Sequence, residues 1–311
     1  MSAVFASLVP VALLVGLGVL LKRTLVPEEV QWAGFERIAY WVLIPALLGE
    51  KVYSADLDSV PLSALALALI GAIFAMAVIV VLVKWPLNAA DIDDRSYSSV
   101  FQTSTRWNGY IALAVIAPLS GNEGMTLIAV AMAAMIPVIN VENVIALTLW
   151  GTERPKNRLM LLVVVVSNPL IWSTVGGLLL NLLDVPIPEG ILAALRIAGA
   201  GALGATLMIV GAGLDLATVF RPSLPVAVAV LLKLAVMPTL VFGFGLATGL
   251  TGSALQAAVL CGAVPTALNG YVLARQMGGD APLYARIASV QTLLAFFTIP
   301  AALWLAGQFS G

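Results

Sequence analysis

The chain has 311 residues, of which 61% are hydrophobic and 10% charged, with a net charge of −1, one cysteine and no histidine. Because soluble domains carry about 25% charged residues, this composition excludes an ordinary water-soluble protein and indicates an integral membrane protein. The charge balance argues against a nucleic-acid partner, the cysteine and histidine counts exclude a disulfide framework and the usual metal sites, and we expect no cofactor.

Ten apolar segments follow one another, each long enough to cross about 30 Å of hydrocarbon as a helix at 1.5 Å per residue. They are 3–21, 32–49, 61–84, 97–119, 124–150, 160–183, 190–213, 223–248, 253–277 and 283–307. No basic region precedes the first segment, so we expect a true span rather than a cleaved signal peptide. Cys261 is expected to be a small buried hydrophobe. Prolines are expected to kink several spans, namely Pro45, Pro137, Pro169, Pro238, Pro265 and Pro300.

The second half of the sequence repeats the first. A shift of 159 positions aligns the segment from Pro10 with that from Pro169 without a gap, including a shared Val-Pro and a shared Arg-Ile-Ala, and two residues of drift then bring Asn108 opposite Asn269. This self-similarity indicates a duplication.

The duplication divides the chain into two five-helix repeats, 1–152 and 153–311. Because five is an odd number, the second repeat must enter the membrane from the opposite side, which gives an inverted repeat as in many secondary transporters. We therefore predict an all-α integral membrane protein with ten transmembrane helices.

Basic residues are divided unevenly between the two sides. The loops on one side hold ten, which are Lys22, Arg23, Lys84, Arg95, Arg154, Lys156, Arg158, Arg221, Arg275 and Arg286, and the loops on the other side hold Lys51 and Arg196. Since cytoplasmic loops are enriched in Lys and Arg, we expect a multi-pass protein of the inner cell membrane with both termini outside.

Three further cations lie within spans. Arg37 is near a span entrance and can extend to the headgroups. Arg106 and Lys233 lie about ten residues, or ~14 Å of helix, from the cytoplasmic side, at a depth similar to that of Glu142. Buried ions are functional candidates unless they are paired. A structural ion pair between Arg106 and Glu142 is the alternative, and it would still leave one cation for an anionic ligand.

The tripeptide Asn-Gly-Tyr occurs twice within apolar segments, as Asn108, Gly109 and Tyr110 and as Asn269, Gly270 and Tyr271. Gly inside a helix costs about 1 kcal/mol relative to Ala, and Asn competes for backbone hydrogen bonds, so we expect a helix break at each. Irregular backbone survives in a membrane only where protein or a water-filled cavity satisfies it, and half-helix N-termini favour anions. Close helix contacts through small residues are the alternative.

These residues resemble the auxin efflux carrier family, which includes the plant PIN-formed carriers and bacterial dicarboxylate permeases. The resemblance covers the whole chain. It rests on "RWNGYIAL" followed by "IPVINVENV", on "SNPLIWSTVGG", and on "AVPTALNGYVLARQMGGD" followed by "FFTIPAALWL".

The resemblance implies the fold of the bile acid–sodium symporters, with two inverted five-helix repeats and crossed broken helices at spans 4 and 9. Spans 1, 2, 6 and 7 would form a scaffold, and spans 3–5 and 8–10 would form a moving transport domain. A homodimer would assemble through the scaffold helices. The crossover would carry the substrate carboxylate by an elevator-type shift. Many relatives have Gly-x-Pro after the first Asn, whereas this chain has Leu113-Ala114-Val115, so its first break must depend on Asn108-Gly109.

The leading hypothesis is a secondary transporter of small organic anions, either auxin-like or mono- or dicarboxylates, and not an enzyme. Its predicted substrate-binding residues are Arg106, Asn108, Gly109, Tyr110, Pro265, Asn269, Gly270 and Tyr271. The alternative is a sodium-coupled symporter of the bile-acid type, whose ion-coupling candidates are Asn140, Glu142, Gln291, Thr292 and Lys233. Glu142 is also a candidate proton carrier. An intramembrane enzyme or sensor is disfavoured because no catalytic constellation lies within the spans.

Overall fold

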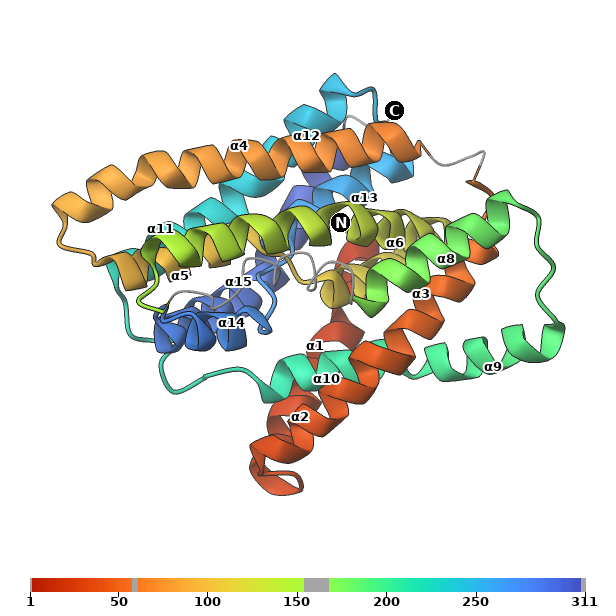
Figure 1. Ribbon diagram of the computed structural model, residues 1–311, viewed down its shortest axis with the longest axis horizontal. Coiled ribbons are helices and arrows are strands. Elements are labelled where there is room, and N and C mark those ends of the chain that lie inside the picture. Colours follow the sequence, from red (N-terminus) through yellow and green to blue (C-terminus); the bar gives the residue numbers. More distant parts are fainter. Residues whose placement is uncertain (1, 58–60, 154–167, 309–311) are drawn as a thin grey trace. The chain divides into compact units, whose positions relative to one another are not determined.

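A computed structural model describes residues 2–57, 61–153 and 168–308, and all the regular secondary structure in these ranges is helical (Figure 1). The helices of the first half are α1 (Ser2–Thr24), α2 (Glu29–Ile38), η1 (Ala39–Leu43), α3 (Ile44–Tyr53), α4 (Leu62–Ala89), α5 (Asp94–Thr105) and α6 (Gly109–Trp150). Those of the second half are α8 (Pro169–Leu182), α9 (Glu189–Ala200), α10 (Ala202–Ala212), α11 (Leu224–Leu231), η3 (Leu232–Val236), α12 (Met237–Ala247), α13 (Gly252–Ala263), α14 (Gly270–Gln276) and α15 (Ala281–Gly307).

The all-α membrane architecture is confirmed, because within the described residues six helical segments are long and apolar enough to cross a membrane and two shorter apolar helices accompany them. The expected ten spans are not all recovered as separate helices. Spans 4 and 5 lie in one stretch, Asp94–Trp150, which bends at Gly121 with φ of 53°. The start of span 6 and the loop cations Arg154, Lys156 and Arg158 lie outside the described residues.

The described helices form two compact units, and each unit takes elements from both halves of the sequence. Unit 1 contains α1–α3, the part of α6 from Tyr110 to Ala133, and α8–α10. Unit 2 contains α4, α5, the rest of α6, and α11–α15. The first Asn-Gly-Tyr is divided between them, since Gly109 belongs to unit 2 and Tyr110 to unit 1.

Unit 1 is built on two helix pairs, α1 with α10 and α3 with α8, which lie side by side (Figure 1). Glycines allow the close approach: a Cβ on Gly18 would overlap the backbone of Met208, and one on Gly177 would lie 2.6 Å from the carbonyl oxygen of Gly49. The same shift of 159 positions that aligns the two halves converts the first contact into the second. The repeat in the sequence therefore has a counterpart in the packing.

Two of the prolines expected to kink spans follow π-helical turns. Pro45 lies just after η1, whose end is marked by a hydrogen bond from the Ile44 N–H to the Ala39 carbonyl. Pro238 lies in the same relation to η3, where the N–H of Met237 bonds to the carbonyl of Leu232. A proline has no N–H for the preceding turn, so the helix widens by one residue before it.

Unit 2 has a core formed by α5 and α13 against α11, α12 and α15. Every residue of α5 from Tyr97 to Thr105 is buried, although this segment is rich in Ser and Thr. Most of the hydroxyl groups are accommodated because they donate to carbonyls of their own helix, as Ser104 does to Val100 and Thr105 to Phe101. Ser99 instead donates to the carbonyl of Asp280. Both α5 and α13 end inside the unit, and the candidate site lies at those ends.

Candidate functional site

α5 and α13, both in unit 2, each end just before one of the two Asn-Gly-Tyr tripeptides. α5 ends at Thr105, Arg106 is extended with φ of −69° and ψ of 155°, and a helix resumes at Gly109. α13 ends at Ala263, Val264 is extended with φ of −66° and ψ of 150°, and a helix resumes at Gly270. The first interruption forms without the Gly-x-Pro of related sequences, as the sequence led us to expect.

The two asparagines differ in exposure. Asn108 is 1% exposed, whereas Asn269 is exposed and precedes α14. Pro265 is buried in the second interruption, and Tyr271 is half-buried. The N–H of Tyr271 bonds locally, to the carbonyl of Leu268, so α14 presents fewer free donors than an open helix N-terminus would.

A buried tyrosine supports the second interruption from α15. The hydroxyl of Tyr284 donates to the Ala267 carbonyl at 2.5 Å and lies 3.1 Å from the hydroxyl oxygen of Thr266. It also lies where a Cβ on Gly270 would be, so Gly270 is needed for this close approach. Among the predicted residues of the second interruption, Gly270 is therefore required because a larger side chain would clash with Tyr284.

Arg106 connects the first interruption with charged and polar groups around it. The residue is 7% exposed, and Glu142 and Tyr284 are close enough to act on it electrostatically. Among the described residues Arg106 and Glu142 do not form an ion pair within 4.0 Å, and the Arg106 Nε has no hydrogen-bond partner. The side chain of Thr105 lies beside the Glu142 carboxylate. The two charges are therefore neighbours without a direct bond, an arrangement that leaves Arg106 available to a carboxylate.

Lys233 does not join this pair. Its side chain is fully buried in η3, its Nζ has no hydrogen-bond partner within the described residues, and its electrostatic neighbour is Cys261 on α13. Cys261 is buried, as expected. The sequence places all three charges at a similar depth along their helices, but in the structure only Arg106 and Glu142 are electrostatic neighbours.

Two of the other ion-coupling candidates make hydrogen bonds to backbone groups within unit 2. Thr292 donates to the Ala288 carbonyl of its own helix, and the Gln291 oxygen accepts from the backbone of Thr266. Asn140 is half-buried. In the part of the chain that the structure describes, no hydrogen bond joins these residues or Glu142 to one another.

The remaining predicted residues lie around the first interruption. Gly109 begins α6 and is half-buried. Tyr110 belongs to unit 1 and is half-buried there, with Tyr40 and Glu36 as electrostatic neighbours. Its role in a shared site with the residues of unit 2 stays a prediction.

Several residues of this region were not anticipated from the sequence. Asn143 donates to the hydroxyl oxygen of Thr105 at 3.1 Å and to the Ile139 carbonyl at 2.7 Å. Tyr284 and Thr266 support the second interruption. The Ser/Thr-rich segment "SYSSVFQTST" could have indicated that this span is surrounded by other helices, since a polar span must be packed in protein rather than exposed to lipid.

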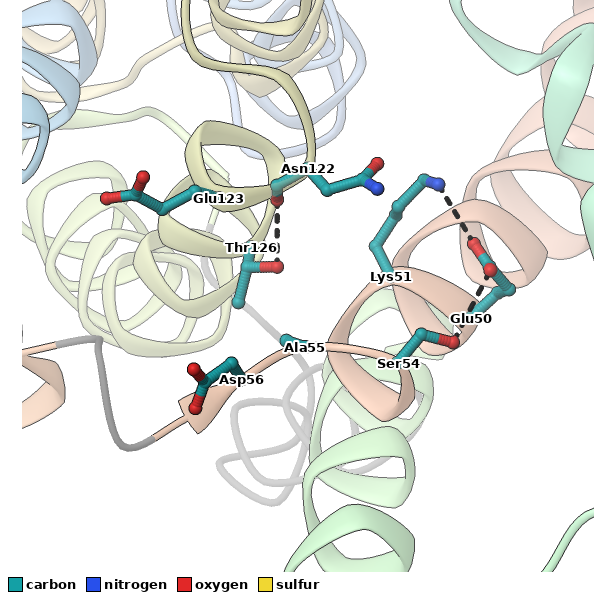
Figure 2. A pocket seen from close by; sticks show the side chains of 8 residues that line it. All are labelled: Glu50, Lys51, Ser54, Ala55, Asp56, Asn122, Glu123 and Thr126. Atoms are coloured by element: carbon teal, nitrogen blue, oxygen red, sulfur yellow. Dashed lines mark hydrogen bonds and ion pairs between the residues drawn. The ribbon is translucent and has the colours of Figure 1, made fainter.

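Unit 1 contains a separate polar pocket of about 220 Å³ between the end of α3 and the part of α6 that follows Gly121 (Figure 2). It is lined by Glu50, Lys51, Ser54, Ala55, Asp56, Asn122, Glu123 and Thr126. The pocket lies apart from the interruptions in the sequence, and none of the predicted site residues lines it.

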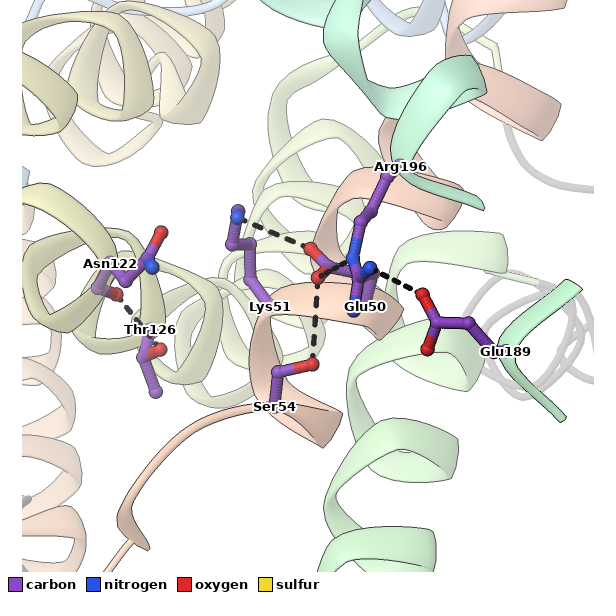
Figure 3. A network of polar contacts seen from close by, with 7 residues as sticks. All are labelled: Glu50, Lys51, Ser54, Asn122, Thr126, Glu189 and Arg196. Carbon is purple, nitrogen blue, oxygen red and sulfur yellow. Dashed lines mark hydrogen bonds and ion pairs between the residues drawn. The ribbon is translucent and has the colours of Figure 1, made fainter. Parts of the chain in front are cut away.

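A charge network borders this pocket (Figure 3). The buried carboxylate of Glu50 lies 3.2 Å from both Lys51 and Arg196, and Arg196 also pairs with Glu189 at 2.8 Å. Lys51 and Arg196 are the two cations that the sequence assigns to the outer side. Glu50 therefore engages both of them, which accounts for a carboxylate buried in an apolar helix.

Comparisons with known proteins agree with these features. A family model described as "membrane transport protein" matches residues 3–304. The chain is 30% identical over 206 residues to the uncharacterized transporter YfdV of Escherichia coli K12, and equally to its counterparts in E. coli O157:H7 and Shigella flexneri. The matched region is 63% of this chain and 63% of each relative, so it spans less than two thirds of the relatives' length.

Proposed function

Because this chain belongs to the membrane transport protein family, the family of the PIN-formed auxin efflux carriers, we propose that it is a secondary transporter of small organic anions. The substrate class is auxin-like monocarboxylates or other mono- and dicarboxylates. The observation that supports this most directly is Arg106, a buried cation without an ion pair in the described residues. It lies next to the first helix interruption and near Tyr284, which supports the second interruption from α15.

In this proposal the substrate carboxylate binds at the two interruptions. Arg106 supplies the charge, the Asn108 and Asn269 amides supply hydrogen bonds, and the ends of the interrupted helices supply backbone dipoles. The interrupted helices move together as a transport domain in an elevator-type alternating-access cycle. Charged ligands are bound in such a site because protein groups replace the water that the ligand loses.

The proposed topology is ten spans in two inverted repeats, 1–152 and 153–311, with both termini on the outer side of the inner membrane. The related contacts Gly18–Met208 and Gly177–Gly49 support the duplication, and the two interruptions occur at corresponding places of the two halves. A homodimer through the scaffold helices is part of this proposal.

We propose proton coupling through Glu142, with Lys233 as a second ionisable candidate, rather than sodium coupling. Glu142 lies deep within span 5 of the proposed topology, and its carboxylate makes no ion pair in the described structure. A sodium cage from Asn140, Glu142, Gln291 and Thr292 is less favoured because Gln291 and Thr292 use their polar groups within the protein.

Purified protein in proteoliposomes tests the function. We expect saturable uptake of at least one of [14C]indole-3-acetate, [14C]succinate and [14C]malate, and acceleration by an inward proton gradient. Arg106→Ala should abolish the uptake. If well-folded wild-type protein exchanges none of the carboxylates, the proposal is wrong, and uptake that requires sodium would favour the symporter alternative.

A further inference from the structure

One side chain of α15 connects both interruptions of unit 2. Gln291 is fully buried. Its Nε2 donates to the Thr103 carbonyl at 3.1 Å and to the Ala229 carbonyl at 3.0 Å, and its Oε1 accepts from the Thr266 N–H at 3.0 Å. A single carboxamide thus links α5, α11 and the segment between α13 and α14.

Two of the three backbone groups that Gln291 binds, the Thr103 carbonyl and the Thr266 N–H, are ones that the interruptions leave without helical partners. In a continuous helix the Thr103 carbonyl would accept from Trp107, but Trp107 lies beyond the end of α5. Likewise the Thr266 N–H lies beyond the end of α13 and cannot bond back into it. At membrane depth no lipid group can replace these bonds.

Only a carboxamide carries two N–H donors and an acceptor at one tip, so Gln291 can satisfy an acceptor on one interruption and a donor on the other. Tyr284 lies seven residues, or about two helical turns, before Gln291, and so on the same face of α15. It bonds to Ala267 and Thr266. The second interruption is therefore held at two neighbouring points by α15, and Gln291 extends this support to α5.

We propose that Gln291 is a positioning residue that fixes the two interruptions to each other, so that the site residues on both hold one geometry. This rests on the proposed function in that those residues are taken to bind the transported anion. The positioning does not depend on which substrate is transported, because the hydrogen bonds of Gln291 are made to the protein itself.

The test compares Gln291→Met, which keeps the length and removes all polar atoms, with Gln291→Glu, which keeps an oxygen acceptor and removes the amide donors. Thr298→Val is the matched control, because Thr298 is seven residues further along α15 and its hydroxyl has no hydrogen-bond partner in the described structure. Hydrogen exchange of the ligand-free protein is measured over 103–108 and 264–269, together with melting temperature and the KM of proteoliposome uptake for indole-3-acetate, succinate and malate.

We expect Gln291→Met to speed exchange in both segments, because it removes all three hydrogen bonds of the carboxamide. The KM should rise by about tenfold, since the site residues are then less well positioned, with a far smaller effect on Vmax. Gln291→Glu should speed exchange mainly in 103–108, because it can still accept from Thr266. Thr298→Val should change neither exchange nor KM.

A lower melting temperature with unchanged KM and unchanged local exchange would reduce Gln291 to a packing residue and overturn the proposal. If Gln291→Met does not fold, the segment-specific exchange of Gln291→Glu decides the question. If wild type transports no carboxylate, the proposed function fails, and the exchange measurements still accept or reject the positioning role.

Discussion

Asn108 and Asn269 hold matching places at the two interruptions but differ in their surroundings. Asn108 is almost wholly buried, and Asn269 is exposed at the start of a short helix. A buried amide is held by its neighbours, whereas an exposed amide is free to reorganise when a ligand arrives. We therefore expect both to contribute to anion affinity, and only Asn108 to contribute much to stability.

Alanine substitutions separate these contributions. Asn269→Ala should weaken binding of the transported carboxylate by at least tenfold, the effect of losing one charge-assisted hydrogen bond, with an unchanged melting temperature. Asn108→Ala should weaken binding similarly and also lower the melting temperature. Ligand affinity and thermal unfolding of the purified variants check this, and unchanged affinity in both would remove the asparagines from the site.

Glu142→Gln tests the second residue-scale prediction. Because Glu142 makes no direct ion pair with Arg106, the variant should fold with nearly the yield of wild type. If Glu142 carries the coupled proton, substrate exchange between equal concentrations should persist while accumulation driven by a proton gradient is lost. Normal driven accumulation in Glu142→Gln would rule out this role, and a large loss of yield would indicate a structural charge interaction instead.

Close helix contacts provide a test at the scale of the element. A Cβ on Gly177 would lie 2.6 Å from the carbonyl oxygen of Gly49, whereas a Cβ on the adjacent Gly176 would meet nothing within 4 Å. Gly177→Ala should thus destabilise the α3–α8 pair by ~1–3 kcal/mol, as overpacking does. Gly176→Ala should be neutral or stabilising by up to ~1 kcal/mol. Unfolding of both variants in detergent decides it, and equal stabilities would show that α8 can shift freely.

The start of α5 gives a prediction about pH. Asp93 caps this helix by accepting from the Ser96 N–H at 2.8 Å, and the hydrogen bonds with Ser96 hold the pKa of Asp93 below its usual range. The stabilisation is therefore fully present above the usual pKa of an aspartate and is lost as the pH falls through the lowered value. Asp93→Ala should cost ~1 kcal/mol at neutral pH, and Asp93→Asn should keep the cap without this pH dependence. Unfolding of the variants across acidic pH checks both.

The sequence predicted the location of the interruptions better than their contacts. Asn-Gly is a poor helix former in any surroundings, so the breaks follow from local propensity. Gln291 bonds to the Thr103 carbonyl, 188 positions away in the chain, and no local pattern reports such a contact. For the same reason the sequence did not reveal the hydrogen bonds of Gln291, and it did not separate Lys233 from Arg106 and Glu142.

The span count was harder to predict from hydropathy alone. Spans 2 and 8 contain π-turns, and spans 4 and 9 contain the interruptions. Spans 4 and 5 meet at Gly121 with only a short polar stretch between them. Hydropathy reports how apolar a segment is and not where its hydrogen-bond pattern changes. The membrane class was therefore predictable, while the division into separate helices depends on packing.

At the scale of the whole molecule the orientation can be tested with single cysteines in a Cys261→Ala background. Ser2→Cys should react with a membrane-impermeant maleimide in intact cells, because the proposed topology places the N-terminus outside. Asp91→Cys, in a loop on the opposite side, should react only after permeabilisation. The reverse pattern would invert the topology, and labelling of both residues from outside would contradict the number of spans between them.

The paired glycine contacts of unit 1 have a consequence for the origin of the chain. In the second repeat, Gly177 corresponds to Gly18 and Met208 corresponds to Gly49. Gly18 contacts Met208 and Gly177 contacts Gly49, so each repeat gives position 18 to position 49 of the other, which is the pattern of a two-fold dimer interface. If the halves arose by duplication, the ancestor was a five-helix protein whose copies assembled in opposite orientations through this contact. In such a dimer both copies of position 49 carry the same residue, so the present difference between Gly49 and Met208 arose only after the ancestral gene had been duplicated.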